Sequence, residues 1–241
     1  MKGDARERIL SRIRAGSERH WPGTLREHPA GQGMVEPQRE RPGPISRTYR
    51  RSGSRSRPEI LDLFGERVSD YRATVVRCTE SELSERVARA LGGRGVRRLV
   101  VPADLPPSWL DTLPEGAMEI LRDGEGGDSF SKGKIASCDG VLTGCALGIA
   151  ETGTIVLDAG SAQGRRALTL LPDYHLCVVL GEQVVETVPE STTKLDAGVK
   201  ALRRPLTLIS GPSATSDIEL VRVEGVHGPR NLEVILVGEA P

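Results

Sequence analysis

The sequence is poor in aromatic residues and has no long apolar run. Phe, Trp and Tyr make up 3% of the 241 residues, and hydrophobic residues together make up 37%. A core must therefore be built mainly from Val, Leu, Ile and Ala, which suits a parallel sheet covered by helices. No apolar stretch approaches the roughly 18 residues that a membrane-spanning helix needs, and no secretory signal is recognisable. We therefore expect a cytoplasmic protein without a membrane span.

The four cysteines form no metal-binding motif. Cys78, Cys138, Cys145 and Cys177 are widely spaced, and none belongs to a Cys-x-x-Cys pair. This spacing argues against zinc and iron–sulfur sites, so no metal site is predicted in the chain. Reduced thiols are expected in a cytoplasmic protein.

Net charge is zero, but the charges are unevenly distributed. Residues 1–57 hold 14 Arg and Lys against 6 Asp and Glu, and the remainder carries the opposite excess. Residues 21–58 are rich in Pro, Gly, Ser and Arg and offer little apolar surface to offset the entropy of ordering. We expect residues 1–58 to form a short charged helix at 4–19 and a partly flexible basic linker. Contact with the chain's own body or an acidic partner is favoured over nucleic-acid binding for this segment.

Residues 59–241 are expected to form a single α/β domain. Apolar runs predict strands at 73–78, 96–102, 117–121, 140–142, 154–157, 175–181, 206–210 and 232–237. Helical spacing predicts helices at 59–71, 83–91, 109–113 and 189–204, and Thr79 with Glu82 forms a capping box ahead of the second of these. The strand–helix–strand order at the start of this region indicates right-handed crossovers and a mostly parallel sheet. The acidic, Gly-rich residues 123–128 are expected to form a surface loop.

A Gly-rich stretch at 143–158 joins two of these strand-like runs. Glycines at 144, 148 and 153 permit backbone conformations with positive φ and the close approach of another chain or a ligand. Glu151 lies among them, and a carboxylate held in such a turn is a candidate functional group. A solvated glutamate in a Gly-rich hairpin is the competing interpretation.

Three further polar turns lie at strand ends, at 172–175, 210–217 and 225–229. Ligands of open α/β sheets bind beyond the carboxyl ends of strands, which favours the turn at 210–217. Its glycine, its hydroxyls and an expected helix start would present N–H groups to a phosphate or carboxylate, although it lacks the Gly-Lys-Ser/Thr ending of a Walker loop. Helix capping by the same hydroxyls is the competing interpretation.

These turns supply the candidate site residues. Glu151, His175 and His227 are the candidate catalytic groups, because carboxylates and imidazoles perform acid–base chemistry. His175 is also compatible with a strand-end histidine bonded to backbone. Arg165 and Arg166 follow a Gly-rich loop and could bind an anion, but surface charges are the favoured interpretation. The candidate substrate- or anion-binding residues are Gly144, Thr152, Gly153, Ser210, Gly211, Ser213, Thr215 and Asp217.

Four motifs resemble the lactate utilization protein C family, which carries the LUD domain. In chain order they are TGCALGIAETGTIVL at 143–157, LLPDYH at 170–175, ISGPSATSDIE at 209–219 and GVHGPR at 225–230. The resemblance covers residues 59–238, so most of the basic segment falls outside it. It implies a three-layer α/β/α fold with a mostly parallel sheet, similar to the NagB/RpiA/coenzyme A transferase-like superfamily of sugar-phosphate isomerases and transferases.

The resemblance also implies a role in the oxidation of L-lactate to pyruvate. The chain is then an accessory or substrate-binding subunit that takes a small carboxylate or phosphate. Its expected partners are A-type and B-type subunits, which carry iron–sulfur clusters, and no cofactor is expected in this chain itself.

Two alternatives stay open. Residues 151–153, Glu-Thr-Gly, distantly resemble the Glu-Asn-Gly turn of coenzyme A transferases, whose glutamate attacks a thioester; here Thr152 replaces the asparagine. The chain would then be an independent enzyme of the transferase or sugar-phosphate isomerase type that uses Glu151. In the other alternative, the polar turns only shape an interface.

Overall fold

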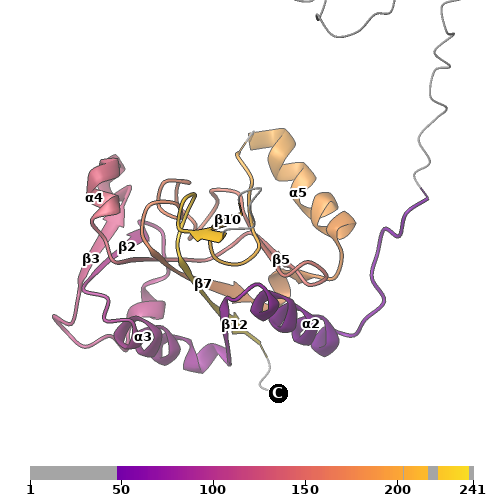
Figure 1. Cartoon of the computed structure of the whole chain (residues 1–241), viewed down its shortest axis with the longest axis horizontal. Coiled ribbons are helices and arrows are strands. Elements are labelled where there is room, and N and C mark those ends of the chain that lie inside the picture. The colour runs from indigo at the N-terminus through magenta and orange to yellow at the C-terminus, as the bar shows by residue number, and fades with distance from the viewer. Residues whose placement is uncertain (1–47, 203, 217–221, 239–241) are drawn as a thin grey trace, which may run out of the picture. The chain divides into compact units, whose positions relative to one another are not determined.

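The computed structural model describes residues 48–202, 204–216 and 222–238 (Figure 1). These residues belong to a compact unit that spans Thr48–Pro241. The helix expected at 4–19 and the linker as far as residue 47 lie outside the described residues, as does Asp217.

A six-stranded sheet forms the centre of this unit. Its strands are, in spatial order, β1 (Thr74–Cys78), β12 (Asn231–Val237), β7 (Tyr174–Leu180), β4 (Gly140–Thr143), β2 (Arg98–Pro102) and β3 (Glu119–Asp123). Every neighbouring pair is parallel, which confirms the predicted parallel sheet. β7 and β12 are buried along almost their whole length, because helices and further strands cover both faces.

Helices pack on both faces of the central sheet. α3 (Leu83–Gly93) lies on one face, with Leu83, Val87 and Leu91 against the side chains of β2, β4, β7 and β12. α2 (Arg57–Asp70) and α4 (Lys132–Ala136) contribute to the opposite face through Phe64, Val68 and Ile135. Short 3₁₀ turns at Glu80–Glu82, Pro107–Leu110, Glu125–Gly127 and Gly181–Gln183 complete the connections.

Two of the helical segments begin with the hydrogen bonds that their sequences encode. Ser56 and Glu59 form a capping box at the start of α2, where the Ser56 N–H donates to the Glu59 carboxylate over 2.8 Å. Thr79 and Glu82 do the same ahead of α3, over 2.9 Å, as the sequence predicts. That box closes a 3₁₀ turn from which α3 continues.

A second, four-stranded sheet carries the Gly-rich stretch. Its order is β8 (Val184–Val185), β5 (Leu147–Ile149), β6 (Thr154–Leu157) and β9 (Thr207–Ile209). β5 and β6 form an antiparallel hairpin, and β9 pairs antiparallel with β6 at the edge. α5 (Val188–Leu202) packs on this sheet through Leu195. The hairpin expected around Glu151 is therefore present, within a sheet that the sequence did not predict.

Two sequence expectations are wrong. The turn after β9 does not open a helix: residues Ala214–Ser216 form β10, which pairs antiparallel with β11 (Arg222–Glu224). The acidic loop at 123–128 is not wholly a surface loop, because Asp123 is 7% exposed and ends β3 inside the protein. Within the described ranges, no helix combines the length and apolarity that crossing a membrane requires.

Candidate functional site

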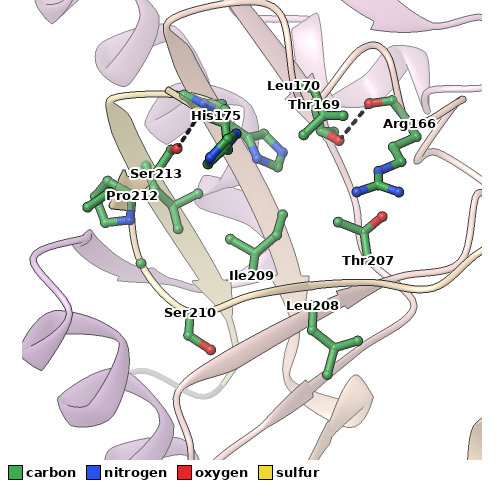
Figure 2. A pocket seen from close by; sticks show the side chains of 16 residues that line it. Arg166, Thr169, Leu170, His175, Thr207, Leu208, Ile209, Ser210, Pro212 and Ser213 are labelled. Atoms are coloured by element: carbon green, nitrogen blue, oxygen red, sulfur yellow. Dashed lines mark hydrogen bonds between the residues drawn. The ribbon is translucent and has the colours of Figure 1, made fainter. Parts of the chain in front are cut away.

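A cavity of about 290 Å³ brings together three of the four polar turns (Figure 2). His175 comes from the start of β7, Ser210, Gly211 and Ser213 from the turn after β9, and His227 from the turn before β12. Residues more than 30 positions apart in the chain thus line one site. The convergence of these candidate residues is the main geometric result.

The cavity lies at the amino ends of the central strands. His175 is the second residue of β7, and Leu232, which also lines the cavity, is the second residue of β12. The sequence argument placed a ligand at the carboxyl ends of the strands, and this location is different. The reason is that β9 is an antiparallel edge strand of the second sheet, so the carboxyl-end rule for parallel sheets does not apply to its turn.

Ser213 fixes the two turns to each other. Its N–H donates to the Pro229 carbonyl over 2.8 Å, and its carbonyl accepts from the Gly225 N–H over 3.0 Å. Its hydroxyl oxygen accepts from the His227 N–H over 3.1 Å. The hydroxyl proton of Ser213 remains available to a ligand, and the backbone of His227 is held in place while its side chain stays exposed.

Gly211 shapes the turn by its lack of a side chain. Its φ is +80°, and a Cβ atom here would lie 2.5 Å from the carbonyl oxygen of Tyr71. Only glycine accepts this combination without strain. Gly211 is thus required for the turn to pack against the end of α2.

His175 is buried, with 1% exposure, and bonded to a side chain. Its Nε2 lies 2.8 Å from the Thr143 hydroxyl, which comes from the neighbouring strand β4. The hydroxyl either donates or accepts, so it suits both neutral tautomers of the ring. With Nε2 engaged, Nδ1 is the nitrogen left for another partner.

Arg166 supplies a cation to the cavity. It is exposed, and in Figure 2 it lies with Thr207 on one side of the cavity, whereas Pro212 and Ser213 lie on the other. No Asp or Glu is among the described residues that line the cavity. A guanidinium beside imidazoles and hydroxyls, without a carboxylate, is a setting for an anion.

Arg165 has a different role from Arg166 and is not a free surface charge. Its guanidinium forms a two-point ion pair with Asp123, at 2.8 and 3.0 Å, and also donates to the Phe130 carbonyl. Burial raises the pKa of Asp123, but hydrogen bonds from Arg165 and the Phe130 N–H outweigh it and leave this pKa below the ordinary value of 3.8. The pair joins β3 to the loop that precedes Arg166.

Glu151 does not line this cavity. It lies in the turn between β5 and β6, where its N–H donates to the Glu186 carbonyl over 3.1 Å and its carboxylate pairs with Arg50. The next residue, Thr152, borders a more apolar cavity of about 390 Å³ between α5 and the second sheet. The Thr152 hydroxyl is 2.7 Å from that of Thr154, which is 2.8 Å from that of Ser210, so hydroxyls connect the two cavities.

The remaining candidate residues lie apart from the cavity. Gly144 donates its N–H to the Ala162 carbonyl over 2.7 Å, and a Cβ atom at this position would be 3.3 Å from Trp109. Gly153, with φ at +56°, closes the hairpin against the backbone of Arg67. Thr215 lies in β10, opposite Val223.

Sequence reasoning missed one contributor to the site and undervalued another. It favoured a surface charge over an anion-binding role for Arg166, which is exposed and also lines the cavity. It did not single out Thr143, whose hydroxyl is significant only because of the β4–β7 register. Among the described residues, no group of three or more His, Cys, Asp or Glu is arranged to hold a metal ion.

Comparison with known proteins agrees with this description. The family model described as "LUD domain" matches residues 61–237. The chain is 51% identical over 183 residues to lactate utilization protein C of Deinococcus radiodurans, covering 76% of this chain and 82% of that protein. It is 30% identical to uncharacterized protein YkgG of Escherichia coli, covering 70% and 75%.

A solved structure is similar as well. A crystal structure of a DUF162 family protein from Deinococcus radiodurans superposes with a TM-score of 0.64 at 44% identity, covering 77% of this chain and all of that one. Residues 61–237, which the family model matches, contain β7, β12 and every turn that lines the cavity. The chain therefore belongs to the LUD domain family, in its lactate utilization protein C group.

Proposed function

We propose that the chain binds a small carboxylate, L-lactate or pyruvate, in the cavity between the turns at 210–213 and 225–229. It would serve as the accessory or substrate-binding subunit of a lactate-oxidising system. The observation that carries the proposal is the lining of the cavity, with one guanidinium, two imidazoles and several hydroxyls but no carboxylate among the described residues. The lactate-oxidising system is proposed from the names of the relatives, because several are lactate utilization proteins C.

The chemistry of the lining suits a 2-hydroxy or 2-oxo acid. The Arg166 guanidinium is the natural partner of the carboxylate, since such charge-assisted hydrogen bonds are about twice as strong as neutral ones. The imidazoles of His175 and His227 and the Ser213 hydroxyl can bond the oxygen at the second carbon. At about 290 Å³ the cavity lies at the lower end of ligand sites, which favours a small acid over a nucleotide.

The proposal extends to partners. Conversion of lactate to pyruvate removes two electrons, and iron–sulfur subunits of A and B type would accept them, while this chain would need no cofactor of its own. The whole assembly would act in the cytoplasm. The parallel sheet with helices on both faces supports a three-layer fold of the NagB/RpiA/coenzyme A transferase-like kind.

The Glu151-dependent enzyme has less support. The Glu151 carboxylate pairs with Arg50 and lies outside the cavity that holds both histidines. A nucleophilic carboxylate also needs hydrogen-bond donors for the developing oxyanion. The hydroxyls and imidazoles of the cavity could donate, but Glu151 does not line that cavity.

Isothermal titration calorimetry with L-lactate and pyruvate tests the binding proposal. Arg166→Gln should weaken binding by about tenfold or more, because losing a charge-assisted contact costs about 1.5 kcal/mol or more. The matched control is Arg89→Gln, since Arg89 is an exposed arginine on α3 that pairs with Glu85. Equal affinities for the two variants, or no binding of either acid by the parent protein, would contradict the proposal.

Growth and co-purification test the role in a lactate system. Deleting the gene should abolish growth on L-lactate but not on pyruvate, and Arg166→Gln should restore growth poorly compared with Arg89→Gln. The tagged protein should co-purify with iron–sulfur proteins from cells grown on lactate. Normal growth of the deletion strain would refute this role even if the cavity binds lactate.

A further inference from the structure

A row of buried polar side chains runs along the sheet behind His175. In the parallel pairing of β4 with β7, Val141 lies opposite His175 and Thr143 lies opposite Cys177. Because alternate residues of a strand share a face, His175, Cys177 and Thr143 lie on the same side of the sheet. Cys145 follows two residues after Thr143 and packs in the same core cluster as Cys177.

The two cysteine side chains are in contact. They pack in one core cluster and lie close enough to shift each other's pKa, and the Cys177 thiol donates over 3.7 Å to the carbonyl oxygen of Gly144, the residue directly before Cys145. Gln183 fixes Cys145: its amide nitrogen donates to the Cys145 carbonyl over 2.9 Å, and its oxygen lies 3.5 Å from the Cys145 sulfur. All four cysteines of the chain are free thiols in this structure.

The two thiols differ in their access to solvent. Cys145 lines a cavity of about 480 Å³ that is separate from the candidate ligand site and bordered by Asp158, Lys194 and Arg204. Cys177 is fully buried and does not line this cavity. A small oxidant that enters this cavity therefore meets Cys145 first.

The contact also changes the acidity of the pair. The hydrogen bond from Cys145, supported by His175 and Thr143, holds the pKa of Cys177 below that of an ordinary thiol. The same contact raises the pKa of Cys145. By contrast, burial raises the pKa of both Cys78 and Cys138, and neither of these has a hydrogen bond to another thiol.

We propose that Cys145 and Cys177 form a reversible oxidation site, at which a hydroperoxide converts the two contacting thiols to a disulfide. The proposal stands on the contact between the sulfurs, the opening beside Cys145, and the polar residues that surround Cys177. Disulfides in cytoplasmic proteins are typically of this transient, redox-responsive kind.

The reaction balances in two steps. The Cys145 sulfur attacks one oxygen of hydrogen peroxide and gives up its thiol proton. The O–O bond breaks, hydroxide leaves, and Cys145 becomes a sulfenic acid. The Cys177 sulfur then attacks the Cys145 sulfur: the S–S bond forms, the S–O bond breaks, and a second hydroxide leaves. The two thiol protons convert both hydroxides to water, and the thiols supply the two electrons that reduce the peroxide.

Oxidation should also alter the candidate ligand site. Cys177 lies two residues after His175 on the same face of β7, and His175 lines that site, so a disulfide changes the group that neighbours the imidazole. The oxidised protein should therefore bind the small carboxylate more weakly. This second part rests on the proposed function, whereas disulfide formation does not.

Mass spectrometry of the full-length protein tests the disulfide. After mild hydrogen peroxide treatment, the peptides with Cys145 and Cys177 should be found cross-linked, two hydrogen atoms lighter, and restored by dithiothreitol. Cys78 and Cys138 are internal controls and should react with a thiol-alkylating reagent after denaturation both with and without peroxide. A disulfide involving either control, or a lasting sulfenic or sulfinic acid on Cys145 without a cross-link, would overturn the proposal, as would no reaction.

Two variants and a binding measurement separate disulfide formation from its effect on ligand binding. Cys145→Ala should lose the cross-link. Because Cys177→Ala leaves a cavity in the core, the unmodified protein is the decisive sample. Calorimetry with L-lactate should show weaker binding after oxidation and recovery after reduction, with Cys145→Ala unaffected by peroxide. A cross-link without any change in affinity would limit the pair to an oxidation site and refute its control of ligand binding.

Discussion

At the residue scale, a single buried carboxylate ties the sheet to the loop that presents Arg166. The Asp123 side chain is 3% exposed and accepts two hydrogen bonds from Arg165 and one, at 2.7 Å, from the Phe130 N–H. Asp123→Asn should lower the free energy of unfolding by about 2–4 kcal/mol, because it leaves a partly buried arginine without its charge partner. Urea denaturation measures this change.

The matched control is another Asp–Arg pair at the surface. Asp62 pairs with Arg77 over 2.6 Å, but Asp62 is 67% exposed. Asp62→Asn should therefore cost less than about 1 kcal/mol. Similar losses for the two variants would show that burial of the Asp123 pair contributes little.

The same pair predicts a pH dependence. The pKa of Asp123 is lower in the folded protein than its ordinary value of 3.8, so the folded state binds the proton less readily than the unfolded state. The stabilisation is complete above about pH 4 to 5 and is lost as the pH falls below that range. The difference in unfolding free energy between the parent protein and Asp123→Asn should shrink on acidification from pH 6 to pH 3, whereas a constant difference would contradict this account.

At the element scale, the hairpin that holds Glu151 depends on Gly153. A Cβ atom here would lie 2.6 Å from the Arg67 carbonyl carbon, and the φ of +56° is itself unfavourable for other residues. Gly153→Ala should therefore cost about 2 kcal/mol or more, measured by thermal or urea unfolding. Gly92→Ala, in α3 with open space around it, should be neutral or stabilising by up to about 1 kcal/mol. If both variants are neutral, the close packing of the hairpin on α2 is not required.

The segment before α2 is held by carboxylates of the β8–α5 region. Glu186, 2% exposed, accepts from the Arg55 N–H over 2.9 Å and from its guanidinium over 2.6 Å, and Glu190 accepts from the Gly53 N–H. Glu186→Gln should speed tryptic cleavage after Arg55 about fivefold, since weakening these contacts by about 1 kcal/mol favours local opening. The exposed Glu85→Gln is the control, and equal cleavage rates in the two variants would exclude a role for Glu186 in holding the segment.

The elements themselves were largely predictable, and their pairing was not. The apolar runs at 175–181 and 232–237 identify β7 and β12, and Thr79 with Glu82 identifies the start of α3. The second sheet was missed because a short run such as Leu147–Ile149 carries no sign of its partners. Likewise, β10 was taken for a helix start because Ser, Thr and Asp serve equally in caps and in tight hairpins.

At the scale of the whole molecule, the site depends on contacts between distant parts of the chain. The last strand, β12, inserts between β1 and β7, and this brings His227 and its turn beside His175. Sequence patterns could nominate the polar turns, but they could not show which would meet, because that depends on strand order. Glu151 illustrates the limit: its motif is as distinctive as the others, yet the chain places it against Arg50, outside the cavity.

The central claim is that both histidines contact one small carboxylate, and histidine-selective NMR tests it most directly. The chain has only four histidines, so the signals of His175 and His227 can be assigned by His175→Gln and His227→Gln. On titration with L-lactate, both signals should shift along saturation curves with the same dissociation constant, and Arg166→Gln should move both curves to higher concentration. Shifts of one histidine alone, or of neither at saturating lactate, would contradict the account.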